Sequence, residues 1–376
     1  MKNEKDLDLK LRMMRFLWYN GYFTRRNVNL LRYTYGRKTE QQYTDIDVWG
    51  IQLDGIFNQH QIICDCKSGV TASTAERFFW LSGIMKYFNA DQGIFLRTKV
   101  RESKYLDLGR KLQILPLSLD QLSELEKAYN LESKPFIGAF NRDVIEKEDV
   151  MFGVLKEKAE PIYDYIQFKY WTDPVQQQIT SLVNSEQKIN NLSDITDEER
   201  LFLQMYILSH LSVSILKFSE PILVIPNKEK EFHVSERLMG GKMESAERRK
   251  LLETFYEFMV EEISKRYNEK YPITKRDFMS NYYPPYLKYF LDLVERICLK
   301  SRVAIHVPRM LDVITYELLL NKKDTNIIDQ IFASDNLDLI EVYKLTKDFM
   351  TFGERSGFIT KKNYELIKDL IYKSKS

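Results

Sequence analysis

The first 130 residues switch several times between helix-like and strand-like spacing of apolar side chains. Over residues 5–20 the apolar side chains recur every three or four positions, which predicts an amphipathic helix capped by Gly21. Short runs rich in β-branched and aromatic residues, bounded by turn residues, predict strands. These strands cover residues 28–35, 43–53, 61–66, 92–97 and 112–117. Helical spacing returns over residues 75–88, 100–110 and 118–130.

Two of these strands form an expected hairpin. Residues 43–53 and 61–66 flank the turn signals Asp54-Gly55 and Asn58, which favours antiparallel pairing. The later strands alternate with helices, and such β-α-β units favour parallel pairing in a sheet covered by helices. The pattern therefore predicts an α/β fold with a mixed sheet flanked by helices.

The rest of the chain has mostly helical spacing. An amphipathic helix is strongly predicted over residues 245–268. Further helices are expected over residues 284–300, 309–322, 337–351 and 361–373. Residues 133–150 contain Pro135, Gly138 and a mixed-charge run, and they are interpreted as a linker. We therefore expect an α/β domain over residues 1–132 and a mostly α-helical second domain over residues 151–376.

Composition agrees with a folded chain and leaves its ligands open. Hydrophobic residues make up 44% and charged residues 29% of the 376 positions, which is typical of globular proteins. The formal net charge is +2, so the total charge argues neither for nor against a nucleic-acid partner. The three cysteines include Cys64 and Cys66 in one expected strand, which disfavours a disulfide framework and a four-ligand zinc site.

No segment reads as a membrane or export signal. The N-terminus is charged and has no apolar core of the kind that signal peptides carry. The most apolar long stretch, residues 208–225, is interrupted by His210, Lys217, Glu220 and Pro221. With free thiols that fit a reducing compartment, these features predict a soluble cytoplasmic protein with no membrane contact.

Charged side chains interrupt the apolar strands of the expected hairpin. Asp47 lies in one strand, and Asp65 and Lys67 share one face of the other because side chains alternate. A buried charge without a partner is costly, and a metal ion would remove that cost for the two aspartates. Mg²⁺ prefers carboxylate oxygens and can activate water beside a phosphate, so the pattern suits phosphodiester hydrolysis.

The motif resembles a known family. Asp47, followed by 17 intervening residues and Asp65-Cys66-Lys67, is similar to the D-x(n)-(D/E)-x-K signature of PD-(D/E)xK nucleases. The contexts DIDVWG and DCKSG are most like the Mrr-like and Holliday-resolvase-like branches, although Ile46 stands where the signature has proline. The order of elements over residues 5–130 also resembles the family, which implies a restriction-endonuclease-like fold for this part of the chain.

The resemblance implies a role for each motif residue. Asp47, Asp65 and the backbone carbonyl of Cys66 would hold Mg²⁺ or Mn²⁺, and Lys67 would act on the attacking water. The family often adds an acidic residue from its first helix. The candidates there are Glu4, Asp6 and Asp8, with Glu40 and Glu76 as substitutes.

The implied activity is that of a metal-dependent endonuclease acting on DNA. Cutting both strands needs two active sites, so the resemblance implies a homodimer or a complex with a separate partner. No phosphate-binding loop is present in the sequence, so an ATPase would have to be that separate partner. The family also favours a role in restriction or antiphage defence, with the helical domain selecting targets, dimerising or binding partners.

Basic residues gather between the first helix and the hairpin, with tyrosines between them. Mixed basic and aromatic side chains suit phosphate contact and base stacking, so this cluster is a candidate DNA contact. Its members are Arg25, Arg26, Arg32, Arg37 and Lys38. The alternative is an ordinary solvated edge.

Two other functions remain open. The domain can be an inactive copy of the nuclease fold that only binds nucleic acid, with Asp65 and Lys67 as a solvated patch. The chain can also be a protein-interaction subunit of a larger complex whose main part is the helical domain. An inactive copy of the fold would bind nucleic acid without metal-dependent cleavage. A protein-interaction subunit would keep its function when Asp65 is changed.

Overall fold

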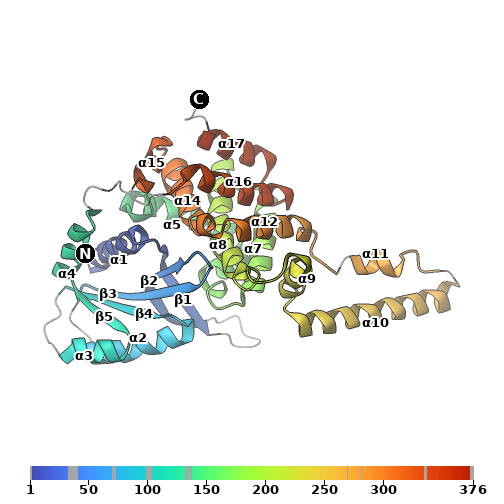
Figure 1. Ribbon diagram of the computed structural model, residues 1–376, viewed down its shortest axis with the longest axis horizontal. Coiled ribbons are helices and arrows are strands. Elements are labelled where there is room, and N and C mark those ends of the chain that lie inside the picture. Colours follow the sequence, from blue (N-terminus) through green and yellow to red (C-terminus); the bar gives the residue numbers. More distant parts are fainter. Residues whose placement is uncertain are drawn as a thin grey trace.

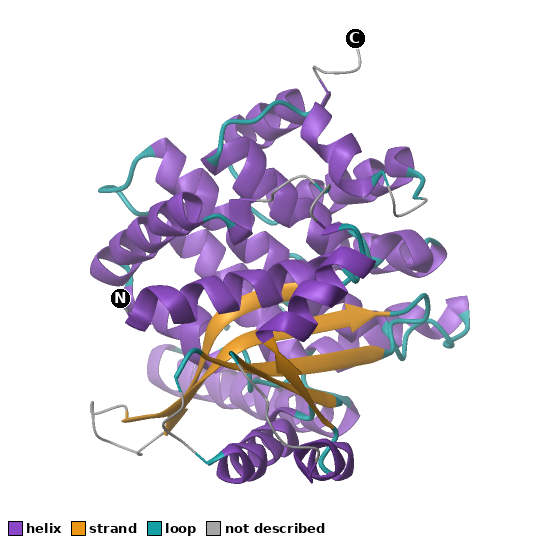
Figure 2. Ribbon diagram, turned by 90° about the vertical axis from the view of Figure 1, so that its left-hand side faces the viewer, coloured by secondary structure: helices purple, strands orange, loops and turns teal. Residues whose placement is uncertain are grey.

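A five-stranded mixed sheet near the N-terminus is covered by helices on both faces and followed by a mostly helical region (Figure 1). The computed structural model describes residues 2–32, 41–69, 73–98, 104–131, 134, 138–268, 270–280, 282–333 and 337–372. Figure 2 shows the strands lying between helices, with most of the helices on one side. The predicted α/β class with a helical second half is confirmed at this level.

The strands follow one another across the sheet in chain order, β1-β2-β3-β4-β5. They are β1 (Phe23–Arg32), β2 (Gln41–Leu53), β3 (Gln59–Lys67), β4 (Gln92–Arg97) and β5 (Ile114–Ser118). Strands β1, β2 and β3 pair antiparallel, and β3, β4 and β5 pair parallel. Both the predicted hairpin and the predicted parallel β-α-β units are therefore confirmed.

The first strand starts earlier than its sequence pattern predicts. We expect a strand over residues 28–35 from the pattern, whereas β1 begins at Phe23, two residues after Gly21, whose positive φ of 93° ends the turn that follows the first helix. The pattern missed the start because Arg25 and Arg26 look like surface residues. In the structure both have carboxylate partners from the helical region, and these ion pairs offset the cost of burying two charged side chains in a strand. The end of the predicted strand, residues 33–35, lies outside the described residues.

Opposite faces of the sheet carry different helices. α1 (Lys2–Tyr19) covers one face, where Leu17 lies against Gly50, and α4 (Leu119–Ala128) is joined to it through Arg12 and Glu126. α2 (Thr74–Phe88) and α3 (Lys104–Lys111) cover the other face (Figure 1). A Cβ atom on Gly93 would come within 2.8 Å of Met85 Sδ, so this glycine lets α2 approach the sheet closely.

The helical region is built around one long apolar helix, α8 (Asp197–Ser219), with α7, α14 and α16 packed against it. Between the sheet and α8 come η2 (Gly138–Phe140), α5 (Arg142–Lys158), α6 (Glu160–Asp164), η3 (Tyr165–Lys169) and α7 (Val175–Asn190). After α8 come α9 (Asn227–Leu238), α10 (Lys242–Tyr267), α11 (Lys275–Ser280), α12 (Leu287–Leu299), α13 (Ser301–Ala304), α14 (Val307–Val313), η4 (Ile314–Leu320), α15 (Asn326–Phe332), α16 (Leu339–Arg355) and α17 (Lys361–Tyr372). The helix predicted over residues 309–322 widens into π-helical turns in η4.

α8 is apolar because it is the centre of this region. Among the described residues it is the one helix long and apolar enough to cross a membrane, yet 94% of its apolar 18-residue window is buried inside the protein. Core packing therefore accounts for its composition. A cytoplasmic location stays a prediction.

α10 and α11 form an arm that extends away from the rest of the protein (Figure 1). Tyr256 and Phe278 pack against each other inside the arm, with ring centroids 5.3 Å apart. Several large apolar side chains of α10 remain exposed: Met243, Leu251, Phe255, Phe258 and Tyr267.

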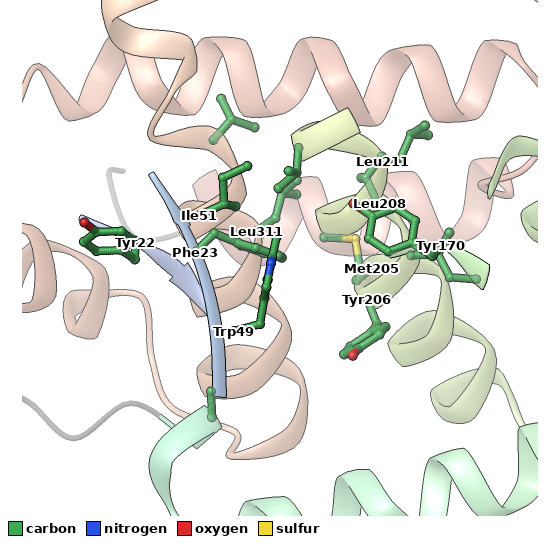
Figure 3. Close-up of a cluster of buried hydrophobic side chains, with 14 of the residues drawn as sticks. Tyr22, Phe23, Trp49, Ile51, Tyr170, Met205, Tyr206, Leu208, Leu211 and Leu311 are labelled. Atoms are coloured by element: carbon green, nitrogen blue, oxygen red, sulfur yellow. The ribbon is translucent and has the colours of Figure 1, made fainter. Parts of the chain in front are cut away.

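The sheet and the helical region share one continuous core. Figure 3 shows Phe23, Trp49 and Ile51 on the sheet side, near Leu311 and Met205 of the helical region. The interpreted linker, residues 133–150, includes buried η2 and the start of α5. The division into domains at these positions stays a prediction.

A buried ion pair crosses the boundary between sheet and helices. Arg25 on β1 donates from Nη2 to Asp312 Oδ1 at 2.8 Å and from Nη1 to Asp312 Oδ2 at 3.0 Å. Ser209 on α8 accepts from the same guanidinium at 2.7 Å. Arg25 and Asp312 are 4% and 2% exposed, so neither charge has water to replace its partner.

We expect Arg25→Met to lower the free energy of unfolding by about 3–5 kcal/mol, because Asp312 then keeps a buried charge without a counter-ion. The double variant Arg25→Met/Asp312→Leu should recover most of this loss. Urea unfolding followed by tryptophan fluorescence measures both. Arg110→Met, which breaks an exposed pair with Asp107, is the control and should change stability by about 0.5 kcal/mol or less. Equal stability of Arg25→Met and the control would contradict the role assigned to the pair.

Candidate functional site

The candidate site lies where β2 and β3 diverge. These strands pair from Leu53 with Gln59 up to Val48 with Cys64, and no pairing between them continues past that point among the described residues. Beyond it β2 pairs only with β1, while β3 continues beside β4 to the pair of Lys67 with Arg97. Asp47 and Asp65 are the first residues past the last shared pair, so both carboxylates lie at this fork.

Asp47 fills the fork with its own carboxylate. Its side chain is 2% exposed, and Oδ2 accepts a hydrogen bond from the backbone N–H of Cys66 at 2.8 Å. A side chain thus replaces the strand-to-strand hydrogen bond that the divergence removes. The same oxygen lies 3.1 Å from Lys67 Nζ.

A lysine from α1 holds the second oxygen of Asp47. Lys10 Nζ lies 2.7 Å from Asp47 Oδ1 and also donates to Asn27 Oδ1 at 2.7 Å. Burial alone would raise the pKa of Asp47, but the ammonium groups of Lys10 and Lys67 outweigh it and hold this pKa below its ordinary value. Asp47 is therefore ionised at neutral pH.

Asp65 is paired with an arginine from α2. Arg77 Nε lies 2.8 Å from Asp65 Oδ2 and Arg77 Nη2 lies 2.6 Å from Oδ1, a bidentate contact. The arginine also lies 3.9 Å from the centre of the Trp80 ring. Asp65 is 1% exposed, and this burial raises its pKa in spite of Arg77 and Lys67.

Lys67 bridges the two carboxylates and reaches solvent. Its Nζ lies 3.5 Å from Asp65 Oδ1, in addition to the contact with Asp47, and its side chain is 38% exposed. Burial would lower the pKa of Lys67, but the two carboxylates raise it, so the ammonium is charged. Two carboxylates thus face three cations, Lys10, Lys67 and Arg77, and the excess of positive charge favours an anionic ligand.

The structure brings together the three predicted catalytic residues, and it adds Lys10 and Arg77, which sequence reasoning missed. Neither has a signal in its local pattern, because each lies on a helix with other charged residues and nothing in the sequence sets it apart from them. Their presence follows from the cost of burying two carboxylates, which requires cations from nearby elements. The sequence shows that the two carboxylates need counter-charges, and the sequence analysis above supplies these from a metal alone.

The other predicted ligands are placed as follows. Cys66 is fully buried, and Glu76 is exposed on the first turn of α2. Asp6 accepts a hydrogen bond from Ser68 N at 2.8 Å, which places it beside the end of β3. Asp8 instead pairs with Arg142, 2.7 Å away. Glu40 and the side chain of Glu4 lie outside the described residues.

The oxygen donors suit a hard cation, but their present partners occupy them. Asp47 Oδ1 is buried and lies 2.7 Å from Lys10 Nζ, so a metal would have to share this oxygen with the ammonium group. Both oxygens of Asp65 are held by Arg77. No group of three or more His, Cys, Asp or Glu residues in the described part of the chain is arranged to hold a metal. A metal therefore fits here only when Arg77 leaves Asp65.

The predicted DNA-contact cluster is partly inside the protein. Arg25 is buried in its ion pair with Asp312, where a nucleic acid cannot reach its guanidinium. Arg26 pairs with Glu148 at 3.0 Å and Asp149 at 2.5 Å, and its side chain is 14% exposed. The side chain of Arg32 and residues Arg37 and Lys38 lie outside the described residues.

No family model matches this chain, and no match was found among curated proteins or solved structures.

We expect Lys10→Met to lower the free energy of unfolding at pH 7 by about 2–3 kcal/mol, because Asp47 loses the counter-ion of Oδ1. The depressed pKa of Asp47 contributes stability above its unfolded value of about 4, and this contribution is lost as pH falls through the folded pKa. The difference between variant and parent should therefore shrink at low pH. Urea unfolding at several pH values measures it.

Lys5→Met is the matched control, because Lys5 is an exposed lysine on the same helix. It should unfold like the parent at every pH. A pH-independent difference for Lys10→Met would show that the ion pair with Asp47 is not its cause.

Proposed function

We propose that the protein is a metal-dependent nuclease of the PD-(D/E)xK, restriction-endonuclease-like type, acting on DNA. The observation that carries the proposal is the convergence of Asp47, Asp65 and Lys67 at the fork between β2 and β3. Three charged side chains buried or half-buried at a strand fork, rather than spread over a solvated hairpin, favour a site over a surface patch. The mixed sheet with its hairpin and β-α-β units is the framework that the family resemblance implies.

The chain's own residues divide the work. Asp47, Asp65 and the carbonyl of Cys66 would hold Mg²⁺ or Mn²⁺, which supplies water activation and charge neutralisation when bound. Lys67, charged and 38% exposed, is placed to orient the attacking water or to stabilise charge on the phosphate. Lys10 holds Asp47 ionised and in position, so it is a positioning residue.

Arg77 has two roles in this proposal. While it is paired with Asp65, it keeps that carboxylate from a metal. Its side chain is 24% exposed and stacks on Trp80 at the surface side, so it can turn away from Asp65 without crossing the core. The guanidinium released in this way would pair with a substrate phosphate, because bidentate contact with phosphate matches that with carboxylate.

One observation favours a second candidate function. The carboxylates at the fork are fully neutralised by Lys10, Lys67 and Arg77 without any metal. Such a network is also what an inactive nuclease fold would retain as a structural element of a nucleic-acid-binding subunit. In that case the extra positive charge would bind nucleic acid without cleaving it.

The remaining expectations rest on the family resemblance. A homodimer or a complex with a separate ATPase or other partner protein, and a role in restriction or antiphage defence, belong to the proposal. DNA contact by Arg32, Arg37 and Lys38 belongs to it as well. Arg25 and Arg26 are not included, because their carboxylate partners already occupy them.

The direct test is cleavage of plasmid, linear and single-stranded DNA with Mg²⁺, Mn²⁺ or EDTA. We expect metal-dependent cleavage that falls by about 100-fold or more in both Asp65→Asn and Lys67→Ala, because the first removes a metal-binding carboxylate and the second removes the ammonium beside the phosphate. Asp107→Asn and Lys127→Ala change exposed residues of the same types and should cleave like the parent. DNA binding without cleavage under every metal condition would favour the inactive fold.

Arg77→Gln tests whether the arginine competes with the metal. We expect this variant to bind Mn²⁺ about tenfold more tightly than the parent in calorimetry, because the metal no longer displaces a guanidinium. Cleavage by the variant should fall at saturating metal, since the phosphate loses its bidentate partner. Unchanged Mn²⁺ affinity would show that Asp65 takes no part in metal binding.

A further inference from the structure

A second cavity lies away from the fork, between the sheet and the helical region. It encloses about 470 Å³, within the range of small-ligand pockets. Its walls come from the part of the β2–β3 hairpin nearest the turn, the turn between α2 and β4, the segment after η3, and α8. Gln59 at the start of β3 lines it, whereas Lys67 at the end of β3 lies in the candidate nuclease site.

Lys217 brings an unpaired charge into this cavity. It is the lysine that interrupts the apolar pattern of α8, and its side chain is half-buried where it lines the cavity. No ion pair or hydrogen bond to Lys217 is found within the described ranges, and burial alone lowers its pKa to about 8. A half-buried ammonium without an ion-pair partner is a suitable counter-ion for an anionic ligand.

Two further polar groups lie at the cavity. Trp171 Nε1 is a buried donor without an acceptor, and the carboxylate of Asp173 lies beside it in the lining. Burial raises the pKa of Asp173, although Tyr165 and Lys169 act against this. Lys217 is not among the groups that influence Asp173, so the cation and this carboxylate do not neutralise each other. A donor and a cation without partners, beside the carboxylates of Asp91 and Asp173, indicate a missing ligand with both donors and an anionic group.

Five aromatic residues line the cavity among polar groups that make up most of its exposed wall. Trp49 and Trp171 meet edge to face with ring centroids 5.0 Å apart, and Tyr170 meets Trp171 at 4.9 Å. Figure 3 shows Trp49 extending from its strand toward the helical region. Tyr87 lies at the rim and is 57% exposed. Such walls favour a flat ring over a simple ion.

We propose that this cavity binds a small ligand that combines a flat ring with an anionic group. The anion pairs with Lys217, the ring packs on Trp49 and Trp171, and an N–H of the ligand donates to Asp173. Nucleoside monophosphates and amino-substituted aromatic carboxylates share this chemistry. The site is separate from the fork, so the proposal does not depend on nuclease activity.

The test is calorimetric titration of the full-length protein in EDTA, so that metal at the fork plays no part. The probes are the four common nucleoside monophosphates, the matching nucleosides, inorganic phosphate and anthranilate. We expect at least one ring-bearing anion to bind with a Kd of about 1 mM or tighter. The nucleosides and inorganic phosphate should bind about tenfold more weakly, because each lacks one half of the recognised chemistry. Binding of a nucleotide would identify the anionic group as a phosphate, whereas binding of anthranilate would identify it as a carboxylate.

Lys217→Met is the decisive variant, and Lys188→Met, which changes an exposed lysine of α7, is its control. Lys217→Met should lose binding by about tenfold or more, since it removes the counter-ion of the ligand. Its melting temperature at pH 7 should equal or exceed that of the parent, because an unpaired buried charge is removed, so lost binding would not reflect unfolding. Trp171→Phe keeps the ring and removes the donor, and it should weaken binding less.

Three outcomes would overturn the proposal. They are the absence of binding by every ring-bearing anion at about 5 mM, equal affinity for nucleosides and nucleotides, and unchanged binding in Lys217→Met. A protein that cleaves DNA but fails this titration would retain the proposed nuclease function and lose the second site. A protein that binds the probes without cleaving DNA would show the reverse.

Discussion

The cost of burying two carboxylates at a strand fork governs the N-terminal part of the structure. Asp47 and Asp65 are each 2% exposed or less, so they need counter-charges from elements that the chain must bring to the fork. Lys10 arrives on α1 from one side of the sheet and Arg77 on α2 from the other. The positions of both covering helices are therefore linked to the chemistry of the site. Any event that changes the charge at the fork, such as arrival of a metal or a phosphate, acts on both helices at once.

The two sites described above treat buried charge in opposite ways. At the fork, cations outnumber carboxylates and every carboxylate has a partner. Around Lys217 a single cation has none. A paired network resists entry of a ligand until one member moves, whereas an unpaired cation attracts a ligand of the right charge directly. If the two proposals hold, the first site needs a change of ion-pair partners before a metal binds, whereas the second can bind its ligand without such a change.

The sequence predicted most of the fold around the site because local patterns there agree with the tertiary structure. The strand over residues 92–97, the buried face of α2 and the Ser118 cap were all readable from spacing and capping residues. The start of β1 was not, because Arg25 and Arg26 fit a strand only through partners such as Asp312 and Glu148, more than a hundred residues away. The same limit applies to the site: the spacing of a known signature identified Asp47, Asp65 and Lys67, whereas Lys10, Arg77 and Lys217 are identified only by tertiary contacts that no local pattern encodes.

The pair of Arg25 and Asp312 joins positions separated by 287 residues in the chain. If either residue loses its charge, the other is left as an unpaired charge in the core. A change at one position is therefore disfavoured unless the second position changes with it. In related chains these two positions are therefore expected to covary or to stay fixed together. Such a signature would mark β1 and α14 as parts of one inherited unit, and it would mean that the sheet and the helices evolved as a whole and were not exchanged as modules.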